Sequence, residues 1–145
     1  IVCSSELDGN THHVGRFIVR KAAILSHSSA KPIALICGGE TTLIVKGRGK
    51  GGRNQEMVLN VLKDLEKIKG AVFVSIGSDG IDGNSSAAGA IADSSTLQKA
   101  KGKKLKLERF LKKNDSNSFF KKVNGEIITG NTETNVMDLQ LVLIK

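Results

Sequence analysis

The chain has 145 residues, 39% of them hydrophobic, which is enough for one domain with a single core. Its 22 Lys and Arg residues outnumber 14 Asp and Glu residues, and the resulting charge of +8 favours anionic partners such as nucleic acid, an acidic membrane or a phosphorylated small molecule. No apolar run approaches the roughly 20 residues that span a bilayer, and the two cysteines suggest no disulfide framework. Both thiols fit a reducing cytoplasm and no segment would cross a membrane, so we expect a soluble, cytoplasmic protein. Charge alone does not choose among the three anionic partners, and we expect no membrane partner.

Strand and helix patterns alternate along the chain. In order, we expect a strand at 1–4, a helix at 11–28, strands at 33–37 and 41–46, a helix at 53–69, a strand at 71–76, helices at 94–100, 105–113 and 116–123, and a strand at 139–144. Residues 1–31 form a strand and helix lead-in, and residues 32–145 form the main domain.

The helix expected at 53–69 has the clearest pattern. Its apolar residues recur at the i, i+3, i+4, i+7 spacing of one buried helix face: Met57, Val58, Val61, Leu62, Leu65 and Ile68. The apolar run 71–76 then follows Gly70 and is typical of a strand buried on both faces of a parallel sheet. Strand, glycine loop, helix and strand form a βαβ unit, so we predict an α/β fold, a three-layer α/β/α domain with a mixed or mostly parallel sheet.

A basic, glycine-rich loop precedes this helix. Residues 47–54 read Gly-Arg-Gly-Lys-Gly-Gly-Arg-Asn. Glycines allow the close approach of backbone N–H groups, and a helix start attracts negative charge. Arg48, Lys50 and Arg53 strengthen this preference, because cationic side chains bind phosphate oxygens well. The loop is predicted to hold an anion, with a flexible, solvated loop as the alternative.

The same loop can be compared with two nucleotide-binding motifs. It departs from a Walker A sequence, because Arg53-Asn54 stands where Lys-Ser/Thr belongs. It does match G-x-G-x-x-G through Gly47, Gly49 and Gly52, and Asp79 follows the next strand, where a ribose-binding acid would lie. A nicotinamide site is therefore a second interpretation, although the flanking cations favour several phosphate charges.

Two carboxylates follow the strand at 71–76. Asp79 and Asp82 lie three residues apart among glycines, at the edge where open α/β sheets bind ligands. They could converge on Mg²⁺ or on substrate hydroxyls, or they could form two Asp-Gly turns. The spacing does not separate these interpretations. The polar loop 129–135 also has two interpretations, a ligand site or a turn.

The densest positive run lies at 101–113 and raises the possibility of a nucleic-acid-binding module. Its apolar residues Leu107, Phe110 and Leu111 fit a helix that packs on the core while its lysines remain in water. Aromatic residues make up only 3% of the chain, which offers few platforms for stacked bases. A solvated helix face is therefore favoured, and we expect no nucleic-acid partner.

Seven short segments occur together in a fixed order. They are 37–42, 49–56, 78–83, 87–90, 114–116, 119–120 and 134–139. Each is weak alone, but the series resembles the MOFRL domain of class II glycerate 2-kinases over nearly the whole span from residue 38 onward. The resemblance implies a fragment of a two-domain, cytoplasmic kinase that transfers the γ-phosphate of ATP to the 2-hydroxyl of D-glycerate with Mg²⁺. The larger, N-terminal domain would lie outside this chain, and residues 1–31 would belong to the junction with it.

The resemblance also implies roles for residues. Arg53 is expected to stabilise charge in catalysis, and the residues expected at the nucleotide are Gly49, Lys50, Gly51, Gly52 and Asn54. Those expected at glycerate are Gly38, Gly39, Glu40, Thr134 and Asn135. Asp79 is expected at Mg²⁺, directly or through water, with Asp82 as the second choice. Some members of the family carry the older label hydroxypyruvate reductase, so a nicotinamide-dependent reductase is the second candidate. We expect the 145 residues to fold without catalysing the reaction alone.

Overall fold

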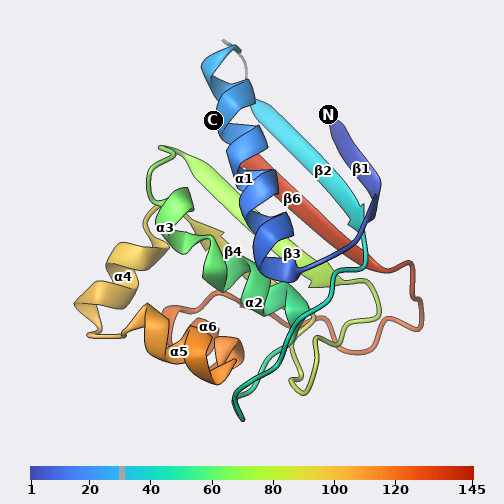
Figure 1. Cartoon of the computed structure of the whole chain (residues 1–145), viewed down its shortest axis with the longest axis vertical. Coiled ribbons are helices and arrows are strands. Elements are labelled where there is room, and N and C mark those ends of the chain that lie inside the picture. The colour runs from blue at the N-terminus through green and yellow to red at the C-terminus, as the bar shows by residue number, and fades with distance from the viewer. Residues whose placement is uncertain (30–31) are drawn as a thin grey trace.

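The computed structural model describes residues 1–29 and 32–145, which build a six-stranded sheet with helices packed on one face (Figure 1). The strands are β1 (Val2–Leu7), β2 (Ile33–Gly39), β3 (Ala71–Gly77), β4 (Gly89–Asp93), β5 (Glu126–Ile127) and β6 (Asp138–Ile144). They lie in the order β1-β2-β6-β3-β4-β5. The β1–β2 pair is parallel and the other four pairs of the described sheet are antiparallel. The predicted mixed sheet is confirmed, whereas the mostly parallel alternative is wrong.

The helices form one layer over the sheet. They are α1 (Thr11–His27), α2 (Arg53–Asn60), α3 (Leu62–Leu65), α4 (Thr96–Gly102), α5 (Leu107–Lys113) and α6 (Ser116–Val123). Figure 1 shows α1, α2 and α3 on the near side of the strands, with α4, α5 and α6 continuing beside them. The core between helices and sheet includes Met57 of α2, Phe73 of β3 and Phe119 of α6, all fully buried.

The opposite face of the sheet carries no helix from the described residues. Buried and more exposed residues alternate along β2 and β6, and the exposed ones include Ile36 and Leu143. The α/β class is confirmed, and this chain supplies two of the three predicted layers.

The insertion of β6 between β2 and β3 creates the edge at which the cavity lies. The register pairs Asp138, at the start of β6, with Gly39 at the end of β2 and with Gly77 at the end of β3. The loop after β2, the loop after β3 and the loop before β6 therefore lie side by side at this edge. This edge corresponds to the place where the sequence predicted ligands.

Several predicted elements need correction. The strand expected at 41–46 is wrong, because Thr42 makes only an isolated bridge to Asn10 and the residues that follow leave the sheet. The helix expected at 53–69 is interrupted at Val61 and ends at Leu65, where the chain turns to enter β3. The short strands β4 and β5 were not predicted. Their sequences have few of the large β-branched and aromatic residues that mark a strand.

The predicted lead-in at 1–31 joins the same sheet and core, since β1 pairs with β2 and α1 packs on α2. The boundary predicted between residues 31 and 32 borders residues 30–31, which lie outside the described part of the chain. In the described ranges, no helix combines the length and the apolar character that a membrane crossing requires.

Candidate functional site

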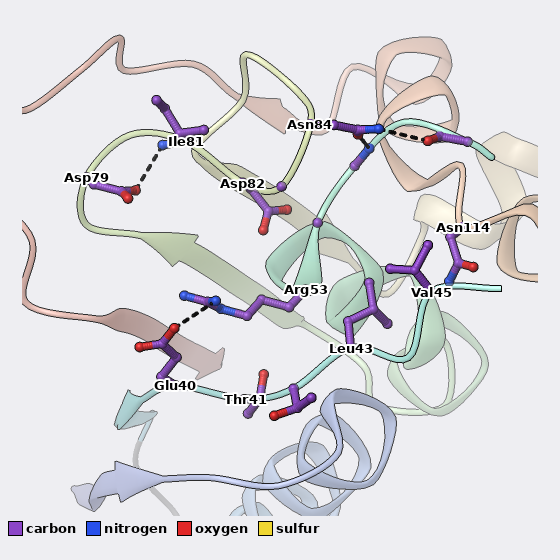
Figure 2. Close-up of a pocket in the computed structure, with 15 residues that line it drawn as sticks. Glu40, Thr41, Leu43, Val45, Arg53, Asp79, Ile81, Asp82, Asn84 and Asn114 are labelled. Atoms are coloured by element: carbon purple, nitrogen blue, oxygen red, sulfur yellow. Dashed lines mark hydrogen bonds and ion pairs between the residues drawn. The ribbon is translucent and has the colours of Figure 1, made fainter. Parts of the chain in front are cut away.

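A cavity of about 910 Å³ opens at the edge where β2, β3 and β6 meet (Figure 2). Its lining comes mainly from three segments that the sequence singled out: the chain after β2, the glycine-rich loop and the loop after β3. The residues are Glu40, Thr41, Thr42, Leu43, Val45, Gly49, Gly51, Gly52, Arg53, Asp79, Ile81, Asp82, Gly83, Asn84 and Asn114. Predicted residues from distant parts of the chain are thus brought together.

Arg53, the first residue of α2, is held by two carboxylates. Its Nε and Nη2 donate to the two oxygens of Asp138, at 2.6 and 3.0 Å. Its Nη1 lies 2.9 Å from Oε1 of Glu40. The hydrogen bonds from Arg53 to Asp138 raise the pKa of the guanidinium above its usual value, although burial partly opposes this. Arg53 therefore stays charged and fixed in direction.

The two carboxylates differ in exposure, and this difference matters for binding. The side chain of Asp138 is 1% exposed and that of Glu40 is 56% exposed. A guanidinium has five N–H groups, and three of them are used in these contacts. Asp138 thus forms a permanent support below Arg53, whereas Glu40 sits at the open side where an anionic ligand could replace it. Sequence reasoning missed Asp138 as a site residue, although it lies in the segment 134–139 that carries part of the family resemblance and at the start of an apolar strand.

Asp82 is buried and caps the start of α2. Its Oδ1 accepts from the backbone N–H of Asn54 at 3.0 Å, and its Oδ2 accepts from the backbone N–H of Gln55 at 2.9 Å. The side chains of both residues donate to the same oxygens. Burial raises the pKa of Asp82, while these donors pull it down. The carboxylate thus occupies the helix start that the sequence offered to a ligand anion.

Asp79 is the more accessible of the two predicted metal ligands. Its Oδ1 accepts from the backbone N–H of Ile81 at 3.0 Å, which is the Asp-Gly turn that the sequence allowed. Figure 2 shows this side chain beside the cavity, on the opposite side of Arg53 from Leu43 and Val45. Within the described residues, no group of three His, Cys, Asp or Glu side chains is arranged to hold a metal ion. A cation at Asp79 would need further ligands from water or from a bound molecule.

The glycine-rich loop is tied down by protein acceptors. The N–H groups of Lys46 and Gly47 donate to Oδ1 of Asn114, at 2.8 and 2.9 Å. Further along, the N–H of Lys50 donates to Asp115 and that of Gly51 to Asn84. These donors were predicted to hold a ligand anion and are used within the fold. The prediction of an anion site now depends on the side chains of Arg48, Lys50 and Arg53.

The glycines are explained by close packing. Gly51 has a φ of 136°, and a Cβ there would lie 2.1 Å from Oγ of Ser116. A Cβ at Gly52 would lie 2.4 Å from Oδ1 of Asp82. The loop therefore needs glycine in order to lie between α6 and the loop after β3, whether or not a phosphate binds beside it.

The remaining predicted residues surround this site without all lining the cavity. Asn54 is buried, and its Oδ1 accepts from Oγ of Ser75 at 2.5 Å, so it supports the loop from below. Gly38 and Gly39 end β2 behind Glu40. Thr134 and Asn135 are exposed on the loop 129–137, which packs on the loop after β3 through the hydrogen bond from Val136 N–H to Ser78 Oγ.

The basic run at 101–113 is a solvated helix surface. Leu107 is buried, and Phe110 and Leu111 pack against the core. Lys101 lies 3.0 Å from Oε1 of Glu66, and its side chain is exposed. These contacts agree with the predicted arrangement of apolar residues inward and lysines outward.

The described geometry is that of an α/β domain with a cavity of mixed polar and apolar lining at one sheet edge. The model of the MOFRL family matches residues 33–138, and this chain belongs to that family. It is 42% identical to the D-glycerate 2-kinase of Thermotoga maritima, with 99% of this chain and 35% of that protein aligned. It is 35% identical to the glycerate 2-kinase of Pyrococcus horikoshii, with 99% and 33% aligned.

A solved structure has the same fold. The crystal structure of the Thermotoga maritima glycerate kinase superimposes with a TM-score of 0.92 at 42% identity. It covers 100% of this chain, which corresponds to 36% of that longer chain. The chain therefore spans about a third of the length of the relatives that it matches.

Proposed function

We propose that this chain is the C-terminal domain of a glycerate 2-kinase that transfers the γ-phosphate of ATP to the 2-hydroxyl of D-glycerate with Mg²⁺. The similarity to glycerate 2-kinases, the family membership and the near-complete alignment of this chain support the proposal. The site supplies an independent physical argument, because its central cation suits a reaction between anions.

The observation that carries the proposal is the support of Arg53 by Asp138. Phosphoryl transfer depends mainly on positioning and on stabilising negative charge, and arginine is well suited to both tasks. Asp138 fixes two N–H groups of Arg53 and leaves the others directed away from the support. An anionic oxygen of glycerate or of the transferring phosphate would take the place of Glu40 at Nη1.

The other predicted ligands extend this arrangement. Gly49, Gly51 and Gly52 let the loop lie against the cavity, and the neighbouring Lys50 adds positive charge for the nucleotide. For Mg²⁺, Asp79 fits better than Asp82, because the oxygens of Asp82 already accept four hydrogen bonds from α2. When bound, Mg²⁺ would offset phosphate charge, and Asp79 would hold it directly or through water.

The test is a pair of assays on the full-length enzyme. ATP with glycerate should yield ADP faster than hydroxypyruvate oxidises a reduced nicotinamide. In the first assay, Arg53→Ala should lower kcat/KM by about 10³-fold or more, whereas Arg109→Ala, at an exposed position on α5, should leave it unchanged. Faster nicotinamide oxidation would establish the reductase alternative. Near-normal turnover of Arg53→Ala would remove Arg53 from the site.

A further inference from the structure

The face of the sheet opposite the helices carries a continuous row of apolar side chains. The register places Ile36 of β2 opposite Leu141 of β6, Leu141 opposite Val74 of β3, and Val74 opposite Ile91 of β4. Directly paired residues of adjacent strands point to the same face. On the other side of β2, Val2 of β1 pairs with Ile36 and extends the row across a fifth strand.

Neighbouring rows are apolar as well. Leu143 of β6 pairs with Ala34 of β2 and with Val72 of β3, and Leu139 pairs with Ile76 of β3. Leu139, Leu143, Ile36 and Ile91 keep between 40% and 44% of their surface exposed. The helix layer shown toward the viewer in Figure 1 does not reach this face.

Such a pattern is unusual for a sheet face in water. Antiparallel strands with one solvated face normally alternate apolar residues inward with polar residues outward. Here the outward positions of three central strands are Val, Ile, Leu and Ala, with Gly38 as the one residue that lacks a side chain. Large contiguous apolar patches mark interaction surfaces. The composition of this face is that of a sheet covered on both sides.

We propose that the open face is covered, in the full-length enzyme, by an apolar helical surface from the part of the same polypeptide that lies outside these 145 residues. The solved Thermotoga maritima relative carries the whole of this fold in a chain of which the fold makes up 36%. About two thirds of such a chain is therefore available to supply the missing layer. This inference concerns the assembly of the domains and does not depend on the proposed reaction.

The aliphatic character of the face favours helices over a second sheet or a charged partner. Aliphatic side chains on a twisted sheet pack against the apolar stripe of a helix, as in other three-layer α/β domains. A second copy of this chain would instead stack two identical sheet faces. The two occupants differ in whether the covering depends on protein concentration.

Thiol labelling of the full-length enzyme distinguishes these states. Ile91→Cys and Leu143→Cys place thiols on the open face, and Arg109→Cys places one at an exposed position of α5, in the helix layer. Each variant is treated with N-ethylmaleimide in the native state, and labelled peptides are quantified by mass spectrometry. Labelling in denaturant gives the reference rate, and light scattering gives the oligomeric state.

The proposal predicts that the thiols of the Ile91→Cys and Leu143→Cys variants are labelled on the order of 100-fold more slowly than the thiol of Arg109→Cys in the monomeric enzyme, since the covered thiols react only after local opening. Labelling at comparable rates would overturn the proposal. Protection that disappears when a dimer is diluted to monomer would also overturn it, and would assign the face to a second copy. Neither readout requires kinase activity, so a failure here is separate from a failure of the proposed function.

Discussion

At the scale of single residues, Asp79 and Asp82 differ in how many hydrogen bonds their carboxylates already accept, so the same substitution should affect them differently. In the full-length enzyme, Asp79→Asn should raise the Mg²⁺ concentration needed for half-maximal activity and change the melting temperature little. Asp82→Asn should lower the melting temperature instead, because it disturbs four hydrogen bonds at the start of α2, and a buried donor left unpaired costs about 1–3 kcal/mol.

Mg²⁺ titrations measure the effect of Asp79→Asn, and thermal melts measure the effect of Asp82→Asn. An unchanged Mg²⁺ requirement in Asp79→Asn would return Asp79 to a role in the turn alone.

The residues of the cavity were easier to predict than the bonds between them. Glycine, cation and aspartate motifs led to Arg53, Asp79 and Asp82, and all three line the same cavity. The partner of Arg53 is Asp138, which is 85 positions away in sequence. Such a pairing depends on β6 lying between β2 and β3, and no local pattern contains that information.

At the scale of elements, most predicted positions hold, but the helix with the clearest periodicity, 53–69, is interrupted at Val61 and ends at Leu65. The helices α1 and α6 and the strands β2, β3 and β6 match their predicted positions closely. The strand predicted at 41–46 was wrong because the main partners of this segment are side chains and not another strand. The N–H of Lys46 donates to Asn114, and Thr41 Oγ1 lies 2.7 Å from Thr11 Oγ1. Tertiary contacts there outweigh the local strand propensity.

The glycine-rich loop provides a test at this scale. Gly51→Ala should destabilise the full-length enzyme by about 1–3 kcal/mol, because a left-handed backbone and the contact with Ser116 both oppose a side chain. Gly102→Ala, in α4, is the matched control, since a Cβ there meets nothing within 4 Å. Chemical denaturation measures the difference. Equal stability of the two variants would show that the loop has room for a side chain at Gly51, and that its glycines are needed for ligand binding instead.

At the scale of the whole molecule, the described residues place helices on one face of the sheet and leave the other face open. The α/β class followed from the alternation of strands and helices, but the predicted third layer is absent from the described residues. Its absence could not be predicted from local patterns, because β3 has the same apolar sequence whichever chain covers it. Active sites of multidomain α/β enzymes commonly lie between domains.

The most direct test of the account compares the isolated 145-residue chain with the full-length enzyme in glycerate phosphorylation by ATP and Mg²⁺. The core between sheet and helices should give the isolated chain a cooperative thermal melt. It should form no phosphoglycerate above the blank, because proximity effects worth up to ~7–11 kcal/mol are lost when one wall of a cleft is missing. The full-length enzyme should form the product readily. Phosphorylation by the isolated chain, or none by the full-length enzyme, would contradict the account.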